Sequence, residues 1–149
     1  MGNYFKRVRN LVHEVLFEGG RRTRIKIFFY TAYIRAKVLL IPMKYLEKSF
    51  GERGAETDTC IDRVDHNEAV WTSIMVNSIC DYTLWNSNCM VRALTAQHIL
   101  KKKHIPTTLY LGLREDDGRM SAHAWLRCGI FLVTGNDGKN YTVVAKFKA

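Results

Sequence analysis

The sequence predicts an α+β fold, with helices in the first two thirds of the chain and a small antiparallel sheet in the last third. Apolar residues recur at helical spacing up to Ile99. From Thr107 onward they alternate with a period of two, as in strands that are buried on one face. Asp117-Gly118 lies between two of these alternating segments and is typical of a hairpin turn. Helices followed by strands, without regular alternation of the two, indicate an α+β arrangement.

Four helices are expected, separated by glycine, proline or polar loops. They cover residues 3–17, 21–49, 67–81 and 89–103. Pro42 is expected to kink or divide the second helix, because proline removes a helical hydrogen bond. The last helix begins at Cys89, where Ser87 or Asn88 is the expected N-cap. Three lysines at its far end suit the negative pole of the helix dipole.

The expected strands follow this last helix and form a small antiparallel sheet. They cover residues 107–113, 120–128, 130–134 and 141–147. Along the second strand, His123 and Trp125 belong to one face, whereas Ala122, Ala124 and Leu126 belong to the other.

The positive charge is concentrated in the first third of the chain. Residues 1–50 hold 11 Lys/Arg against 3 Asp/Glu, whereas residues 51–149 hold 12 against 11. The expected division is therefore a basic helical region at 1–58 and a core domain at 59–149. The boundary between them lies inside a polar loop at 51–65. Such a basic region can meet an acidic protein or, as a peripheral contact, an anionic membrane. Nucleic acid is not the expected partner, because helix packing and solvated cations explain its aromatic and basic residues.

The four cysteines favour a reduced environment over a disulfide framework. No secretion signal or membrane-spanning segment is evident, so a cytoplasmic location is expected. No two cysteines have Cys-x-x-Cys spacing, so no metal site is expected, and no cofactor is implied. Cys60, Cys80 and Cys128 are expected to be small buried side chains.

Cys89 differs from the other cysteines because it stands at an expected helix N-terminus. Unpaired N–H groups and the positive helix pole favour a thiolate there. His123 lies on a later strand and can hold the proton, and Asp137 follows as a group that can orient the imidazole. Asn136 can replace Asp137 in that role, and both are also ordinary turn residues.

Two side chains in the loop before Cys89 are candidates for oxyanion stabilisation or a substrate groove. These are Trp85 and Asn86, which would act together with the Cys89 N–H group.

The surrounding motifs resemble the lasso peptide biosynthesis B2 proteins, which are leader peptidases with a papain-like and transglutaminase-like core. The resemblance rests on Cys-Met-Val-Arg-Ala-Leu at 89–94, Leu-Tyr-Leu-Gly-Leu at 109–113, Ala-His-Ala-Trp-Leu at 122–126 and Gly-Asn-Asp-Gly at 135–138. It implies that Cys89 is the nucleophile, His123 the general base and Asp137 the orienting acid.

The resemblance also implies a bacterial cytoplasmic location, a substrate and partners. The substrate would be a precursor peptide, whose leader a separate B1 leader-recognition protein captures, and a lasso cyclase would act on the freed core. Two alternatives stay open: an acyl-transferring transglutaminase or amidase on the same core, and a non-catalytic basic adaptor.

Overall fold

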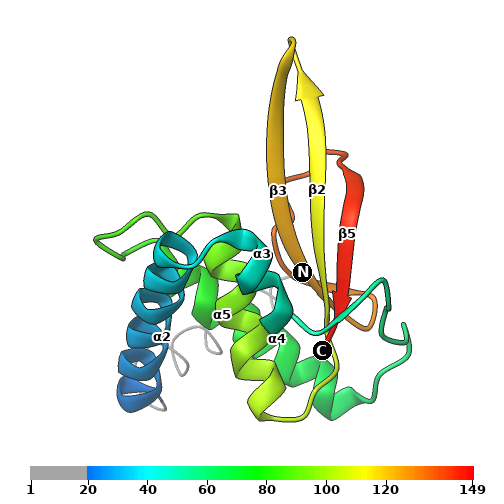
Figure 1. Cartoon of the computed structure of the whole chain (residues 1–149). Helices are drawn as coiled ribbons and strands as arrows, with labels where there is room; N and C mark the ends of the chain where they lie inside the picture. Colours follow the sequence, from blue (N-terminus) through cyan, green and yellow to red (C-terminus); the bar gives the residue numbers. More distant parts are fainter. Residues whose placement is uncertain (1–19) are drawn as a thin grey trace, which may run out of the picture.

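A computed structural model describes residues 20–149 and confirms the α+β prediction. Figure 1 shows the helices gathered on one side and the long hairpin rising beyond them. The helices are α2 (Arg21–Leu40), α3 (Met43–Leu46), the 3-10 turn η2 (Glu47–Ser49), α4 (Arg63–Cys80) and α5 (Cys89–Lys102). The strands are β1 (Glu52–Arg53), β2 (Thr108–Asp116), β3 (Arg119–Cys128), β4 (Phe131–Thr134) and β5 (Thr142–Lys148). The helix expected at 3–17 lies outside the described residues.

The helices form where local signals allow them. Pro42 divides the second expected helix: α2 ends before it, and Pro42 itself caps α3. Helix α4 begins four residues earlier than expected. Asp62 is its N-cap, and the Asp62 Oδ1 atom accepts a hydrogen bond of 2.8 Å from the Asp65 N–H.

The sheet has five strands in the order β1-β5-β2-β3-β4, and every neighbouring pair is antiparallel. Asp117 and Gly118 form the β2–β3 turn, both with positive φ (50° and 74°), as a tight hairpin requires. The expected alternation on β3 is confirmed. Ala124 and Leu126 are buried in the core, whereas His123 and Trp125 are half-buried on the opposite face.

One core joins the helices to the sheet. Helix α5 packs against α2, α4 and β3, and Ile27, Ile34, Val91 and Leu126 belong to the same buried cluster. The segment expected to be a polar loop at 51–65 is tied to this core, because β1 pairs with β5 and the Thr57 N–H donates to Thr108 Oγ1. The expected division after residue 58 stays a prediction, although residues on both sides share this core.

Candidate active site

Cys89 is the first residue of α5, and its half-buried side chain follows a well-defined N-cap. Asn88 is the cap: its Oδ1 atom accepts a hydrogen bond of 3.1 Å from the Val91 N–H. The first N–H groups of a helix have no partner within the helix. Because the cap satisfies only one of them, the N–H groups of the first turn leave a positive pole beside the Cys89 thiol.

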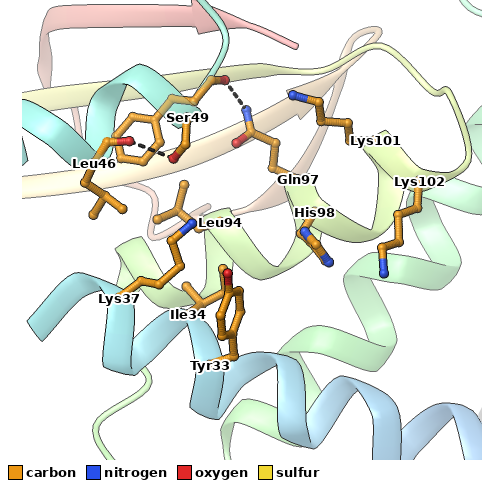
Figure 2. Close-up of a pocket in the computed structure, with 11 residues that line it drawn as sticks. Tyr33, Ile34, Lys37, Leu46, Ser49, Leu94, Gln97, His98, Lys101 and Lys102 are labelled. Carbon is orange, nitrogen blue, oxygen red and sulfur yellow. Dashed lines mark hydrogen bonds between the residues drawn. The ribbon is translucent and has the colours of Figure 1, made fainter. Parts of the chain in front are cut away.

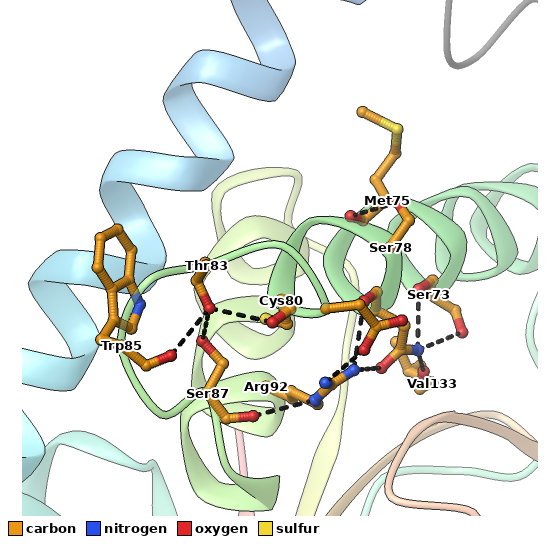
Figure 3. Close-up of polar contacts among 11 residues, drawn as sticks. Ser73, Met75, Ser78, Cys80, Thr83, Trp85, Ser87, Arg92 and Val133 are labelled. Carbon is orange, nitrogen blue, oxygen red and sulfur yellow. Dashed lines mark hydrogen bonds and ion pairs between the residues drawn. The ribbon is translucent and has the colours of Figure 1, made fainter.

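Arg92 fixes the loop that leads into Cys89 (Figure 3). Its Nε atom donates to the Ser87 carbonyl at 3.1 Å, and Nη1 donates to the Asn77 carbonyl at 3.2 Å. Its Nη2 atom pairs with Asp81 Oδ1 at 2.7 Å. The guanidinium therefore ties the C-terminal end of α4 to the start of α5. Ser87 itself is buried and shares a hydrogen bond of 2.7 Å with the Thr83 hydroxyl.

The two oxyanion candidates in this loop differ in accessibility. The Trp85 ring packs against Phe28 of α2 with ring centroids 4.8 Å apart, and its Nε1 is buried without a partner among residues 20–149. In this position the indole holds α2 against the loop and cannot donate to a bound peptide. Asn86 is exposed, so its amide remains the accessible candidate.

His123 lies in the middle of β3, opposite Gly112 of β2. Its Nε2 atom is 2.8 Å from the Gly135 carbonyl oxygen. Because a carbonyl oxygen only accepts hydrogen bonds, Nε2 carries the proton, and the lone pair of the neutral imidazole is on Nδ1. Tyr141 and Trp125 stack on the ring, with centroids 4.7 and 6.0 Å from it. The imidazole is thus held in one orientation with Nδ1 as its basic atom.

Gly135 reaches His123 because it has no side chain. Its φ is +83°, and a Cβ atom there would lie 2.5 Å from the Trp125 Cβ atom and 2.7 Å from the Ala124 carbonyl oxygen. Only glycine combines this left-handed backbone with so close an approach to β3. The group that holds the His123 Nε2–H in this structure is therefore a backbone carbonyl, and neither Asp137 nor Asn136 bonds to it.

The Asp137 carboxylate accepts hydrogen bonds from Lys139 and Tyr141 and not from His123. Its Oδ1 atom accepts from the Lys139 N–H at 3.0 Å, and Oδ2 accepts from the Tyr141 hydroxyl at 2.8 Å. These two hydrogen bonds lower the pKa of the Asp137 carboxyl, and the charge of nearby His123 adds to the effect. The carboxylate therefore supports His123 through the tyrosine ring that stacks on it.

Tyr141 was not singled out by the sequence, yet it contacts both His123 and Asp137. The hydrogen bond to Asp137 raises the pKa of the Tyr141 phenol; burial and the charges of Asp137 and Cys89 act in the same direction, against Arg114. The available sequence signal was a tyrosine three residues after Gly138, at the start of the last expected strand.

His123, Asp137 and Tyr141 line one cavity of about 370 Å³ together with Trp125 and Gly135. Cys89 does not line this cavity, and no hydrogen bond joins its Sγ atom to His123 among the described contacts. The structure therefore brings the imidazole, the carboxylate and the phenol together in one cavity, and Cys89 lies outside the lining of that cavity.

The remaining cysteines differ from Cys89. Cys80 and Cys128 are buried, as expected, and burial raises the pKa of both thiols, that of Cys128 to about 11. Cys60 is exposed, so the prediction that it is buried is wrong. It lies in the extended segment before Asp62, which contributes few side chains to the core. Over residues 20–149, no group of three or more His, Cys, Asp or Glu side chains could hold a metal ion.

A family model described as the transglutaminase-like superfamily matches residues 31–146, and the chain belongs to this superfamily. Membership indicates chemistry of the cysteine-peptidase or transglutaminase type, in which a thiol forms an acyl intermediate. No curated protein and no solved structure matches the chain. In the described part of the chain, no helix has the length and apolar character needed to cross a bilayer.

Proposed function

We propose that this protein is a cysteine peptidase that removes the leader from a lasso peptide precursor. The observation that carries the proposal is Cys89 at the N-terminus of α5 in a chain of the transglutaminase-like superfamily. The orientation of His123, with Nδ1 as its free basic atom, supplies a base of the required kind.

In the first step, the Cys89 thiolate attacks the carbonyl carbon of the last leader residue. The carbonyl π electrons move onto oxygen, and the Cys89 N–H group and the Asn86 amide stabilise this oxyanion. The tetrahedral intermediate then collapses to a thioester. The amine of the core peptide leaves with the proton that His123 Nδ1 took from the thiol.

In the second step, water attacks the thioester carbonyl and transfers a proton to His123. The carbon–sulfur bond breaks, and the free leader carboxylate departs. Both steps need the imidazole within hydrogen-bond reach of Cys89 Sγ. Catalytic hydrogen bonds are often long in a free enzyme and form fully only with substrate bound.

Gly135, Tyr141 and Asp137 act as positioning residues. The Gly135 carbonyl fixes the tautomer of His123, and Tyr141 fixes the plane of its ring. Asp137 accepts a hydrogen bond from the Tyr141 hydroxyl, so it positions His123 indirectly, through the tyrosine ring.

The lasso peptide substrate rests on the motif resemblance at 89–94 and 122–126. In this proposal a separate B1 protein presents the leader, and a lasso cyclase consumes the freed core. The basic N-terminal region then provides the surface for B1, for the leader or for a peripheral membrane contact.

The experiment is incubation of the purified chain with a precursor peptide and its B1 protein, followed by mass spectrometry. Hydrolysis gives two fragments whose summed mass exceeds that of the precursor by one water, and this is the expected result. The superfamily also favours acyl transfer as a second candidate, for which a crosslinked product with loss of ammonia is expected. A non-catalytic adaptor would leave the precursor intact, and its Cys89 would react with iodoacetamide no faster than Cys60.

A further inference from the structure

A second cavity, of about 410 Å³, lies between α2, the α3–η2 segment and the second half of α5 (Figure 2). Four buried apolar side chains contribute to its wall: Ile34, Leu46, Phe50 and Leu94. A mainly apolar cavity of this size, with a few polar groups, is typical of a binding site. None of the residues proposed above for the peptidase site lines it. We call it the lysine cavity.

Lys37, Lys101 and Lys102 line this cavity, and no aspartate or glutamate does. Among the ion pairs of residues 20–149, none involves these three lysines. Burial lowers the pKa of His98 in the cavity wall, and the charges of Lys102, Lys37 and Lys101 lower it further. Positive charge thus acts on the cavity without a carboxylate to offset it.

Helix dipoles explain part of this pattern. Lys37 is in the last turn of α2, and Lys101 and Lys102 are in the last turn of α5, where cations stabilise the negative pole of a helix. This accounts for the sign of each charge. It does not explain why lysines from the last turns of two different helices line the same cavity, nor why no acidic residue within 20–149 lines it.

The surface around the cavity also carries aromatic rings and lysines, and no carboxylate of the described chain lines the cavity itself. Tyr33 lines the mouth and is 54% exposed, and Tyr45 on α3 is also 54% exposed. The ammonium groups of Lys44 and Lys48 lie 5.1 and 5.8 Å from the Tyr45 ring centroid. A small anion would use the cavity alone, whereas a polypeptide can cover both the cavity and these aromatic and basic neighbours.

We propose that the lysine cavity binds an acidic polypeptide segment, which inserts one large apolar side chain and places flanking carboxylates beside Lys37 and Lys101. The apolar wall takes the anchor side chain, as in interface hot spots. Lysines are point charges on flexible stems, so they accept carboxylates at a range of positions. This binding surface is independent of the peptidase chemistry at Cys89.

The test uses the full chain and a fluorescein-labelled peptide with a central phenylalanine flanked on each side by glutamates. Two control peptides replace either the glutamates with glutamine or the phenylalanine with alanine. Fluorescence anisotropy at low ionic strength is expected to show binding of the first peptide, weakened by about tenfold in each control. Because these comparisons use the unmodified protein, they do not depend on how any variant folds.

The protein side of the test compares two double variants that remove equal charge. Lys37→Gln with Lys101→Gln is expected to weaken binding by about fivefold, since an exposed ion pair contributes a factor of roughly two to three. Arg119→Gln with Lys148→Gln alters exposed positions on the sheet and is expected to leave binding unchanged.

Three outcomes would overturn the proposal. The first is absence of peptide binding, or equal binding of all three peptides. The second is equal weakening in both double variants, which would indicate a general charge effect. The third is that the protein binds vesicles of anionic phospholipid but not the peptide, and that the Lys37 and Lys101 changes abolish vesicle binding. That result would assign the surface to a membrane.

Discussion

Replacing Arg92 with methionine should destabilise the protein, because Arg92 holds the loop before Cys89 in place. The side chain is 25% exposed, and it donates to the Ser87 and Asn77 carbonyls. Hydrogen bonds of this kind contribute about 1 kcal/mol each or somewhat more. The pair with Asp81, whose side chain is 61% exposed, adds at most about 1 kcal/mol. The expected loss of unfolding free energy is therefore about 3 kcal/mol.

For a domain of this size, that loss corresponds to a fall in Tm of about 6–12 °C, measured by circular dichroism. The matched control is Arg114→Met, because within residues 20–149 the only ion pair of Arg114 is with Asp116, at 3.2 Å on the exposed hairpin. Its Tm should fall by less than about 3 °C. Equal shifts in the two variants would refute the assignment of Arg92 as the residue that fixes the loop.

Three further changes probe the imidazole site and the thiols. Gly135→Ala should cost about 1–3 kcal/mol of stability and at least about tenfold in peptidase activity, because φ is +83° and the new Cβ meets β3; unchanged activity would contradict this. Asp137→Asn should lower the pKa of Tyr141, since the carboxylate stabilises the protonated phenol; an ultraviolet titration that coincides with that of the wild type is the contrary result. Cys128 should alkylate with iodoacetamide roughly 100-fold more slowly than exposed Cys60, given its pKa of about 11; equal rates in peptide mapping would exclude a buried thiol.

The pH dependence of stability follows from the same carboxyl group. Because the folded-state pKa of Asp137 is lowered, its contribution is present above the unfolded pKa of about 3.9 and is lost as the pH falls through the folded value. Asp137→Asn should therefore flatten the acid limb of the stability curve: it lowers the unfolding free energy at neutral pH, where the contribution is present, and leaves that at the lowest pH nearly unchanged.

The sequence predicts those features of the site that depend on local signals. Asn88 before Cys89 is a short-range cap, and Asp117-Gly118 is a short-range turn, so both elements form where expected. Alternation along β3 likewise assigns His123 to the face opposite Ala124.

The contacts around the imidazole could not be predicted in the same way. A backbone carbonyl has no sequence signature of its own, so the Gly135 oxygen was not distinguished from the side chains of Asn136 and Asp137. Tyr141 reaches His123 only after the 135–141 segment folds back over β3. The Trp85 indole was one of two candidates for an oxyanion or substrate-groove role, and it packs on Phe28 of α2, a contact between segments distant in the sequence.

The central claim is that the Cys89 thiol performs the chemistry of this fold. Its most direct test compares Cys89→Ala with Cys60→Ala in cleavage of a precursor peptide with its B1 protein present, with far-UV circular dichroism to verify folding. Cys89→Ala should be folded and inactive, whereas Cys60→Ala should cleave at the wild-type rate. Cleavage by folded Cys89→Ala at a rate comparable to wild type would contradict the claim.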